Sequence, residues 1–190
     1  MTQQEIIDIF EKTGVIIHGH FRLTSGRHSD VFLQCSQVMQ YPEHAEGICR
    51  ELAGLFTGTQ IDLVIGPALG GIVLAYEVAR SLGARAVFAE RENGKMTLRR
   101  SFTIDRGEKV LVVEDAVSTG GSVNEVAEVV TANGGDIVGI GAFVDRTGGI
   151  VSFGVPFCAL VTMDIKSYAP AECPHCKSGV PLALPKSAQA

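Results

Sequence analysis

The chain has 190 residues, of which 46% are hydrophobic and 19% charged, enough apolar material for one domain with a full core. Its net charge of -5 disfavours a protein that wraps nucleic-acid phosphates non-specifically, because that task requires a basic surface. We therefore expect no nucleic-acid partner. A phosphate-bearing small molecule is compatible with this charge, since backbone amides and a bound cation can neutralise it.

Nothing in the sequence indicates export or a membrane partner. The first residues, MTQQEIIDIFEKTG, lack a basic segment followed by an apolar one. No apolar stretch approaches the ~20 residues that a bilayer requires. The five cysteines are scattered and odd in number, so they do not suggest a disulfide framework. We expect a cytoplasmic protein.

The N-terminal part predicts a helix followed by a small β-rich region. Apolar residues recur at helical spacing up to Gly14. The next segment, VIIHGHFRLTSGRHSDVFLQCSQVMQ, consists of short β-prone pieces interrupted by glycine and polar residues. Residues 1–41 are therefore expected to form a helix and a hood on a single domain that spans 1–190.

From residue 42 onward, apolar runs alternate with helical patterns. Strands are predicted at IDLVIG, ARAVFAE, KVLVVED, IVGIGAFVD and PFCALVTM, and helices over about 43–56, 75–82 and 122–132. Strands that are apolar on consecutive residues and separated by helices are typical of a parallel sheet covered on both faces. The predicted fold class is α/β, a doubly wound, mostly parallel sheet flanked by helices.

The stretch VLVVEDAVSTGGSV, residues 110–123, ends a buried strand in two acids and a turn rich in hydroxyls and glycines. Small residues there let backbone N–H groups converge on a monophosphate at a helix N-terminus. Glu114 and Asp115 would repel phosphate but suit vicinal hydroxyls or hydrated Mg²⁺ nearby. A sugar with a phosphate and a diol satisfies both demands. The alternative is an N-capped junction with solvated carboxylates.

A second turn, PALGG, follows the strand IDLVIG. Its glycines would let pyrophosphate approach the main chain, although a tight strand–helix turn explains them equally. Ligands of open parallel sheets bind beyond the carboxyl ends of the strands, so both turns should line one crevice. The chain has neither a Walker A motif nor a G-x-G-x-x-G turn, which disfavours a nucleoside triphosphatase or a dinucleotide enzyme.

VLVVEDAVSTGGS resembles the phosphoribosyl-pyrophosphate signature of type I phosphoribosyltransferases, and FRLTSGRHSDVFLQC, GPALGG and VDRTGG resemble segments of the orotate phosphoribosyltransferases. The resemblance covers roughly Phe21 to Val151 and implies the type I phosphoribosyltransferase fold. It implies a pentosyltransferase of pyrimidine biosynthesis that converts phosphoribosyl pyrophosphate and orotate to orotidine 5'-phosphate and pyrophosphate. Mg²⁺ would be bound mainly through phosphoribosyl pyrophosphate, and no residue is predicted as a metal ligand.

Two other functions stay open: the same transfer to a purine or another base, and a non-catalytic regulator that senses phosphoribosyl pyrophosphate. The latter often carries a DNA-binding domain, for which this acidic single domain has no room.

Position by position, the resemblance implies roles for individual residues. Glu114 and Asp115 would hold the ribose hydroxyls, while Ser118 and Arg146 would contact orotate. An arginine suits orotate because its planar fork can bind a carboxylate or a ring carbonyl in a bidentate manner. The alternative for Arg146 is a surface salt bridge near Asp145. The residues implied in binding phosphoribosyl pyrophosphate are Leu69, Gly70, Glu114, Asp115, Ala116, Val117, Ser118, Thr119, Gly120, Gly121 and Ser122.

The charged stretch ERENGKMTLRR lies between two predicted strands, with Asn93-Gly94 marking a turn or a mobile tip. Departing pyrophosphate gathers negative charge and needs cations. Lys95 is the leading catalytic candidate, Arg91 supports it, and Asp115 completes the predicted catalytic set. The resemblance implies that this loop closes over the site and reaches the neighbouring subunit of a homodimer. A solvated hairpin with solubilising charge is the alternative.

The sequence also departs from the better-known bacterial orotate enzymes. Thr24 and Gly70 stand where those enzymes carry lysines, which points to a divergent subtype and leaves the base open. Arg27 either replaces one lost cation or has a structural role.

The C-terminal tail, residues 168–190, contains a C-x-x-C pair, Cys173 and Cys176, with metal-ligand spacing. A closed Zn²⁺ site would have to recruit Cys158, Cys35 or a second subunit. We therefore favour a reduced pair or a labile disulfide over structural Zn²⁺.

Overall fold

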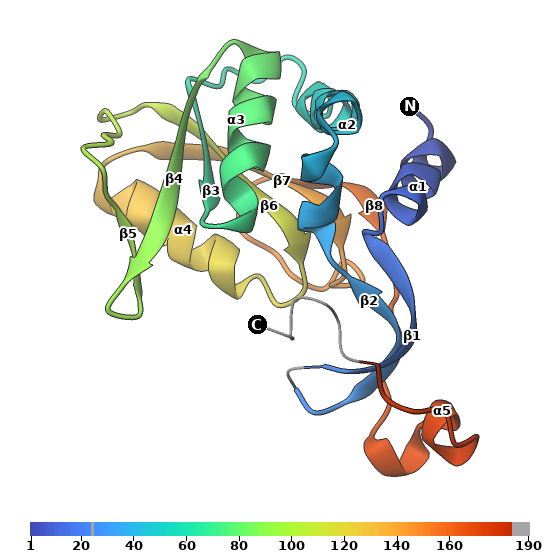
Figure 1. The fold of residues 1–190 in the computed structure, drawn as a ribbon. Coiled ribbons are helices and arrows are strands. Elements are labelled where there is room, and N and C mark those ends of the chain that lie inside the picture. The colour runs from blue at the N-terminus through green and yellow to red at the C-terminus, as the bar shows by residue number, and fades with distance from the viewer. Residues whose placement is uncertain (24, 184–190) are drawn as a thin grey trace.

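The computed structural model describes residues 1–23 and 25–183, and its centre is a six-stranded sheet with helices on both faces (Figure 1). The strands are β3 (Leu63–Pro67), β4 (Arg85–Glu92), β5 (Lys95–Leu98), β6 (Lys109–Val117), β7 (Asp136–Asp145) and β8 (Phe157–Thr162). Their order is β5-β4-β3-β6-β7-β8, and only the β4–β5 pair is antiparallel. The predicted mostly parallel sheet is confirmed.

Helices cover the two faces of this sheet. On one side lie α1 (Gln3–Lys12), α2 (Pro42–Gly54) and α3 (Gly70–Leu82), and on the other lies α4 (Gly121–Ala132). Successive strand residues point to opposite faces, so Val64 packs in the first core and Leu63 in the second. The consecutive apolar runs arise because both faces are buried. Within the described residues, no helix has the length and apolar character needed to span a membrane.

The predicted hood is an antiparallel hairpin of β1 (Ile16–Arg22) and β2 (His28–Leu33), followed by the 3-10 helix η1 (Cys35–Gln40). The hairpin extends away from the central sheet, and the short tail elements η2 (Pro170–Glu172) and α5 (Pro174–Lys177) lie beside its far end (Figure 1). Isolated bridges join His28 to Tyr168 and Phe21 to Ala183. Hood and tail are thus one unit in space, although they come from opposite ends of the chain.

The strand order changes direction between β3 and β6. From β3 the chain continues outward to β4 and β5, whereas from β6 it continues to β7 and β8 on the other side. Such a switch point leaves a crevice beyond the carboxyl ends of the two central strands. The turn after β3 and the turn after β6 are the segments that lie there.

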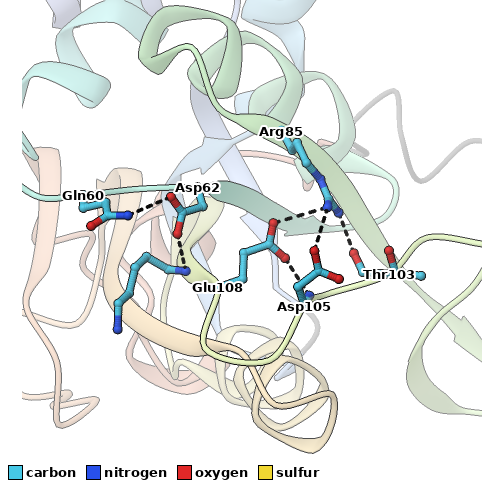
Figure 2. A network of polar contacts seen from close by, with 7 residues as sticks. Gln60, Asp62, Arg85, Thr103, Asp105 and Glu108 are labelled. Carbon is cyan, nitrogen blue, oxygen red and sulfur yellow. Dashed lines mark hydrogen bonds and ion pairs between the residues drawn. The ribbon is translucent and has the colours of Figure 1, made fainter.

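A polar network holds the opposite, amino-terminal end of the same strands (Figure 2). The Asp62 carboxylate accepts a hydrogen bond from the Lys109 backbone N–H at 2.9 Å, and this bond is the main reason why its pKa is lowered. Arg85 pairs with Glu108 at 3.4 Å and donates to the Thr103 carbonyl at 2.7 Å. These contacts fix the connection from β5 to β6, and the crevice opens at the other end of the strands.

Candidate active site

Adjoining cavities open at the carboxyl ends of β3 and β6. One of about 50 Å³ lies inside the turn after β6, within residues 114–123. A second of about 280 Å³ lies between that turn and the turn after β3, and a third of about 310 Å³ lies against the hood. Ser122 borders the first two, while Ser118 and Thr119 border the first and third. The structure therefore brings the two predicted turns together in one continuous crevice.

The turn after β6 is shaped by a glycine and not by a hydroxyl cap. Gly120 is the N-cap of α4, its φ of 76° is left-handed, and no side chain caps the helix. A Cβ at Gly120 would lie 2.8 Å from the Phe153 ring, so only glycine fits. In the described chain, the hydroxyls of Ser118 and Thr119 are not used as caps. The simple N-cap explanation of this sequence is wrong, and the hydroxyls border the cavity of about 50 Å³ instead.

Glu114 and Asp115 end the buried part of β6, where Glu114 is buried and Asp115 is partly buried. Glu114 is 9% exposed, and burial, followed by the charge of Asp115, raises its pKa to about 8. Burial also raises the pKa of Asp115, partly offset by a hydrogen bond from the Ala116 backbone N–H. The alternative of solvated carboxylates is wrong for this pair. Both side chains line the 280 Å³ cavity.

The turn after β3 approaches these acids closely. A Cβ at Gly70 would lie 3.0 Å from the Asp115 carboxylate, and a Cβ at Gly71 would lie 2.9 Å from the Pro67 ring. Gly71 is therefore needed for packing, whereas Gly70 leaves space beside the Asp115 carboxylate. The Ala68–Leu69 peptide bond is cis. The Leu69 side chain is 84% exposed and borders a neighbouring depression beside α3, outside the 280 Å³ cavity.

Arg146 and Ser118 border the cavity beside the hood, next to the turn after β6. The Asp145 carboxylate accepts a hydrogen bond from the Thr147 backbone N–H at 2.7 Å, and Arg146 forms no ion pair within the described residues. The Arg146 Nε is buried and has no hydrogen-bond partner there. The proposed surface salt bridge is wrong, and the guanidinium is available to a ligand. The hood residues around this cavity are Leu23, Ser25, Val31, Phe32 and Leu33.

The charged stretch forms the β4–β5 hairpin. Asn93 and Gly94 both have left-handed backbones, with φ of 52° and 84°, as a two-residue turn of this kind requires. Arg91 pairs with Glu125 at 2.7 Å and lines the 280 Å³ cavity with the two acids. Lys95 lines a different cavity, between the hairpin and α4. The structure thus places Arg91, but not Lys95, at the crevice.

Arg27 has the structural role. Its guanidinium donates to the Ser167 hydroxyl at 2.9 Å and to the Ser167 carbonyl at 2.6 Å, which ties the hood to the tail. Thr24 lies outside the described residues.

The tail cysteines correct another expectation. Cys173 and Cys176 meet neither Cys158 nor Cys35 but the hood histidines His20 and His28. Sequence reasoning missed these two histidines, although the segment HGHFRLTSGRH contains both and is β-prone throughout. It also missed Pro67, Ala68 and Met96 in the crevice wall, whose apolar side chains carry no chemical signal.

Comparison with known proteins decides the family. A family model described as a phosphoribosyl transferase domain matches residues 36–151. An orotate phosphoribosyltransferase from Pelotomaculum thermopropionicum is 57% identical over 187 residues, which cover 98% of each chain. The chain belongs to the orotate phosphoribosyltransferase family. A further member, from Caldanaerobacter subterraneus subsp. tengcongensis, is 56% identical with 98% of each chain covered.

Solved structures confirm the type I phosphoribosyltransferase fold of this orotate phosphoribosyltransferase family member. The orotate phosphoribosyltransferase from Aeropyrum pernix superposes with a TM-score of 0.71 at 25% identity, covering 83% of this chain and 93% of that one. The adenine phosphoribosyltransferase from Rhodothermus marinus superposes with a TM-score of 0.64 at 20% identity, covering 83% and 99%. The second likeness concerns the fold alone.

Proposed function

We infer that this chain transfers the ribose 5-phosphate unit from phosphoribosyl pyrophosphate to orotate, which yields orotidine 5'-phosphate and pyrophosphate. Beyond family membership, one observation carries this inference. The buried Nε of Arg146, which has no hydrogen-bond partner among residues 1–23 and 25–183, borders a cavity that adjoins the turn after β6. A guanidinium without a protein partner suits an anionic base, because its fork can bind a carboxylate through two hydrogen bonds. A purine offers no carboxylate.

The phosphoribosyl unit would occupy the crevice in a defined direction. Backbone N–H groups and hydroxyls from Ala116 to Ser122 would hold the 5-phosphate in the small cavity at the start of α4. Glu114 and Asp115, at the edge of the same turn, would accept hydrogen bonds from the ribose hydroxyls. Gly70 would let pyrophosphate lie close to the main chain opposite Asp115. Leu69 would contribute its backbone alone.

Members of the phosphoribosyltransferase family generally use Mg²⁺ together with phosphoribosyl pyrophosphate. The donor set fits such a cation, because two buried carboxyl groups with raised pKa values face one cavity and offer the oxygen ligands that Mg²⁺ prefers. We propose that the substrate enters as its magnesium complex and that Glu114 and Asp115 contact the cation directly or through water. The bound cation would neutralise charge on the pyrophosphate.

Breaking the bond between C1 and pyrophosphate leaves positive charge on the ribose and negative charge on the leaving group. The carboxylates of Glu114 and Asp115 would lie on the ribose side and would favour the positive centre. Arg91 already borders the crevice and would contact the departing pyrophosphate. We propose that Lys95 joins it when the β4–β5 hairpin closes over a site, either in its own subunit or in a neighbouring one.

The surface of α3 supports a homodimer as the state in which this happens. Leu69, Val73 and Tyr76 recur at helical spacing at its start and are exposed to 84%, 46% and 62%. An exposed apolar patch of this kind is typical of a protein–protein interface. We propose that two copies of the chain pack through this surface.

A base screen with Arg146 variants tests the proposed function. The protein is incubated with phosphoribosyl pyrophosphate, Mg²⁺ and, separately, orotate, uracil, adenine, guanine and hypoxanthine, and pyrophosphate release is followed. We expect turnover with orotate. Arg146→Ala should lower kcat/KM for orotate by roughly 100-fold. Arg146→Lys should have a kcat/KM almost as low as that of Arg146→Ala, because a lysine cannot form the bidentate contact.

The control for this screen is Arg50→Ala, which removes an exposed arginine of α2 that pairs only loosely with Glu46, at 3.9 Å. That variant should keep the wild-type rate. Turnover with a purine and none with orotate would contradict the assignment of the base.

A further inference from the structure

Four side chains with metal-binding atoms converge where the tail meets the hood. His20 lies in β1, His28 in β2, Cys173 directly before α5 and Cys176 within it. Their ligand atoms all lie within 4.8 Å of one another. His20, His28 and Cys173 are buried, with exposed fractions of 2%, 6% and 0%, whereas Cys176 is exposed. In Figure 1, α5 lies at the projecting end of the molecule, beside the β1–β2 hairpin.

Hydrogen bonding alone does not account for this cluster. The His20 Nδ1 lies 2.8 Å from the Val180 carbonyl, which can only accept, so Nδ1 carries a proton. In the neutral ring Nε2 then has a single lone pair. Three atoms lie within hydrogen-bond distance of His20 Nε2: His28 Nδ1 at 3.0 Å, Cys173 Sγ at 3.4 Å and Cys176 Sγ at 3.6 Å. One lone pair cannot accept three hydrogen bonds. A cation at the centre of the four atoms would accept one lone pair from each of them at once.

Four of the six distances among the ligand atoms are close to those of a tetrahedral zinc site. Zinc bonds of about 2.0–2.1 Å to nitrogen and 2.3 Å to sulfur place tetrahedral ligand atoms roughly 3.3 Å apart for two nitrogens and 3.5 Å for nitrogen and sulfur. The nitrogen pair lies 3.0 Å apart, and the nitrogen–sulfur distances are 3.4 Å, 3.6 Å and, for His28 and Cys176, 3.2 Å. The Nδ1 of His20 donates its N–H to the Val180 carbonyl. Zinc-bound histidines usually make a contact of this kind with the ring nitrogen that does not bind the metal.

We propose that His20, His28, Cys173 and Cys176 bind one structural Zn²⁺ ion. Two thiolates and two imidazoles with C-x-x-C spacing form a closed set of four ligands, which leaves no position for a substrate. Ca²⁺ and Mg²⁺ prefer oxygen ligands, and iron–sulfur clusters mostly take four cysteines, so zinc fits this set best. The proposal concerns the chain's own ligands and is independent of the orotate transfer.

The ion would fix the hood against the tail. A two-stranded hairpin such as β1–β2 is marginally stable without further support. Apart from the cluster, its contacts with the tail include the Arg27–Ser167 bonds, the Ser29 hydroxyl on the Lys166 carbonyl at 2.9 Å, and the bridge to Tyr168. Residues of the same hairpin, Val31, Phe32 and Leu33, border the cavity proposed for the base. If the proposed function holds, the metal would also hold one wall of that cavity in place.

The decisive measurement is the metal content of the full chain, purified without an affinity tag and without chelators. Elemental analysis by mass spectrometry should find about one zinc ion per chain in the wild type, as a four-ligand structural site requires. His28→Ala and Cys176→Ala should each lose most of it. The matched control is Cys158→Ala, which removes a cysteine of β8 that lies outside the cluster and should keep the full zinc content.

Cobalt substitution keeps the proposal testable if a variant fails to fold. Wild-type protein in which Co²⁺ replaces zinc should show thiolate-to-cobalt charge-transfer bands and the strong visible bands of tetrahedral cobalt. Wild type that lacks zinc and gives no such spectrum would overturn the proposal, as would a Cys173–Cys176 disulfide in freshly prepared protein. Neither readout depends on activity, so failure of the zinc site and failure of the orotate transfer are distinguishable.

Discussion

Glu114 and Asp115 are adjacent carboxyl groups in β6, and both have raised pKa values. Two adjacent carboxyl groups are withdrawn from water, and neither forms an ion pair within the part of the chain that the structure describes. Charging both is therefore unfavourable until hydroxyl donors or a cation arrive. The substrate would supply both, so its binding should favour the charged form that the free protein disfavours. The free energy needed to ionise these buried groups should appear as a loss of folding stability that depends on pH.

Glu114→Gln should reveal this cost in the ligand-free protein. The pKa of Glu114 is raised from 4.5 to about 8 on folding, so the folded state binds more protons than the unfolded state between these values. The free energy of unfolding of the wild type therefore falls as the pH rises from 4.5 to 8 and does not recover above 8 through this group. The variant lacks the cost and should be more stable than the wild type at pH 9, by roughly 1–4 kcal/mol, with little difference at pH 4.5.

Urea unfolding at pH 4.5, 7 and 9 measures the difference for Glu114→Gln. Glu128→Gln, at an exposed position of α4, is the control and should follow the wild type at every pH. A variant that is less stable than the wild type at pH 9 would show that the ionised Glu114 stabilises the fold, contrary to its raised pKa.

At the scale of elements, the junction of β3 and α3 places the crevice wall. A Cβ at Gly66 would lie 2.7 Å from the Gly71 carbonyl oxygen, and a Cβ at Gly71 would lie 3.1 Å from the Gly66 backbone. Strand and helix thus touch through their main chains. This contact brings the turn between them to the carboxylate of Asp115.

Gly71→Ala should therefore destabilise the protein, although alanine favours a helix over glycine by about 1 kcal/mol. The new methyl group would meet Pro67 and the Gly66 backbone, which cannot rotate away, so we expect a net loss of roughly 1–3 kcal/mol. Gly54→Ala is the matched control, because it lies at the end of α2 with nothing within 4 Å of its Cβ position. Thermal unfolding compares the two, and equal stability of both variants would contradict the close contact.

The elements that could be predicted are those with local causes. The strands β3, β6 and β7 follow from apolar runs, and the crevice follows from the turns after two neighbouring strands. The side of the hairpin on which Lys95 lies could not be predicted. It depends on strand pairing and twist, and the pattern of charges in the sequence does not determine either. The two histidines of the proposed zinc site were missed for another reason: His20 and Cys173 are 153 residues apart, and only the folded chain brings them together.

At the scale of the whole molecule, the positions of Arg91 and Lys95 raise the question of which subunit each serves. Arg91 borders the crevice of its own chain, whereas Lys95 faces the cavity beside α4. The family resemblance implies a loop shared between subunits, and the exposed apolar start of α3 offers a surface for a partner. If Lys95 acts across the dimer, each active site combines the crevice of one chain with the hairpin of the other.

Mixing two inactive variants tests this arrangement. Lys95→Ala and Asp115→Asn should each lower kcat by roughly 100-fold or more on their own. After subunit exchange, half of the dimers would be mixed, and each would contain one intact site, so about a quarter of the wild-type activity should return. Asp115→Asn mixed with Arg146→Ala should recover nothing, because both residues belong to the site of the same chain. Full activity of Lys95→Ala would exclude it from catalysis, and no recovery in the first mixture would confine its action to its own subunit.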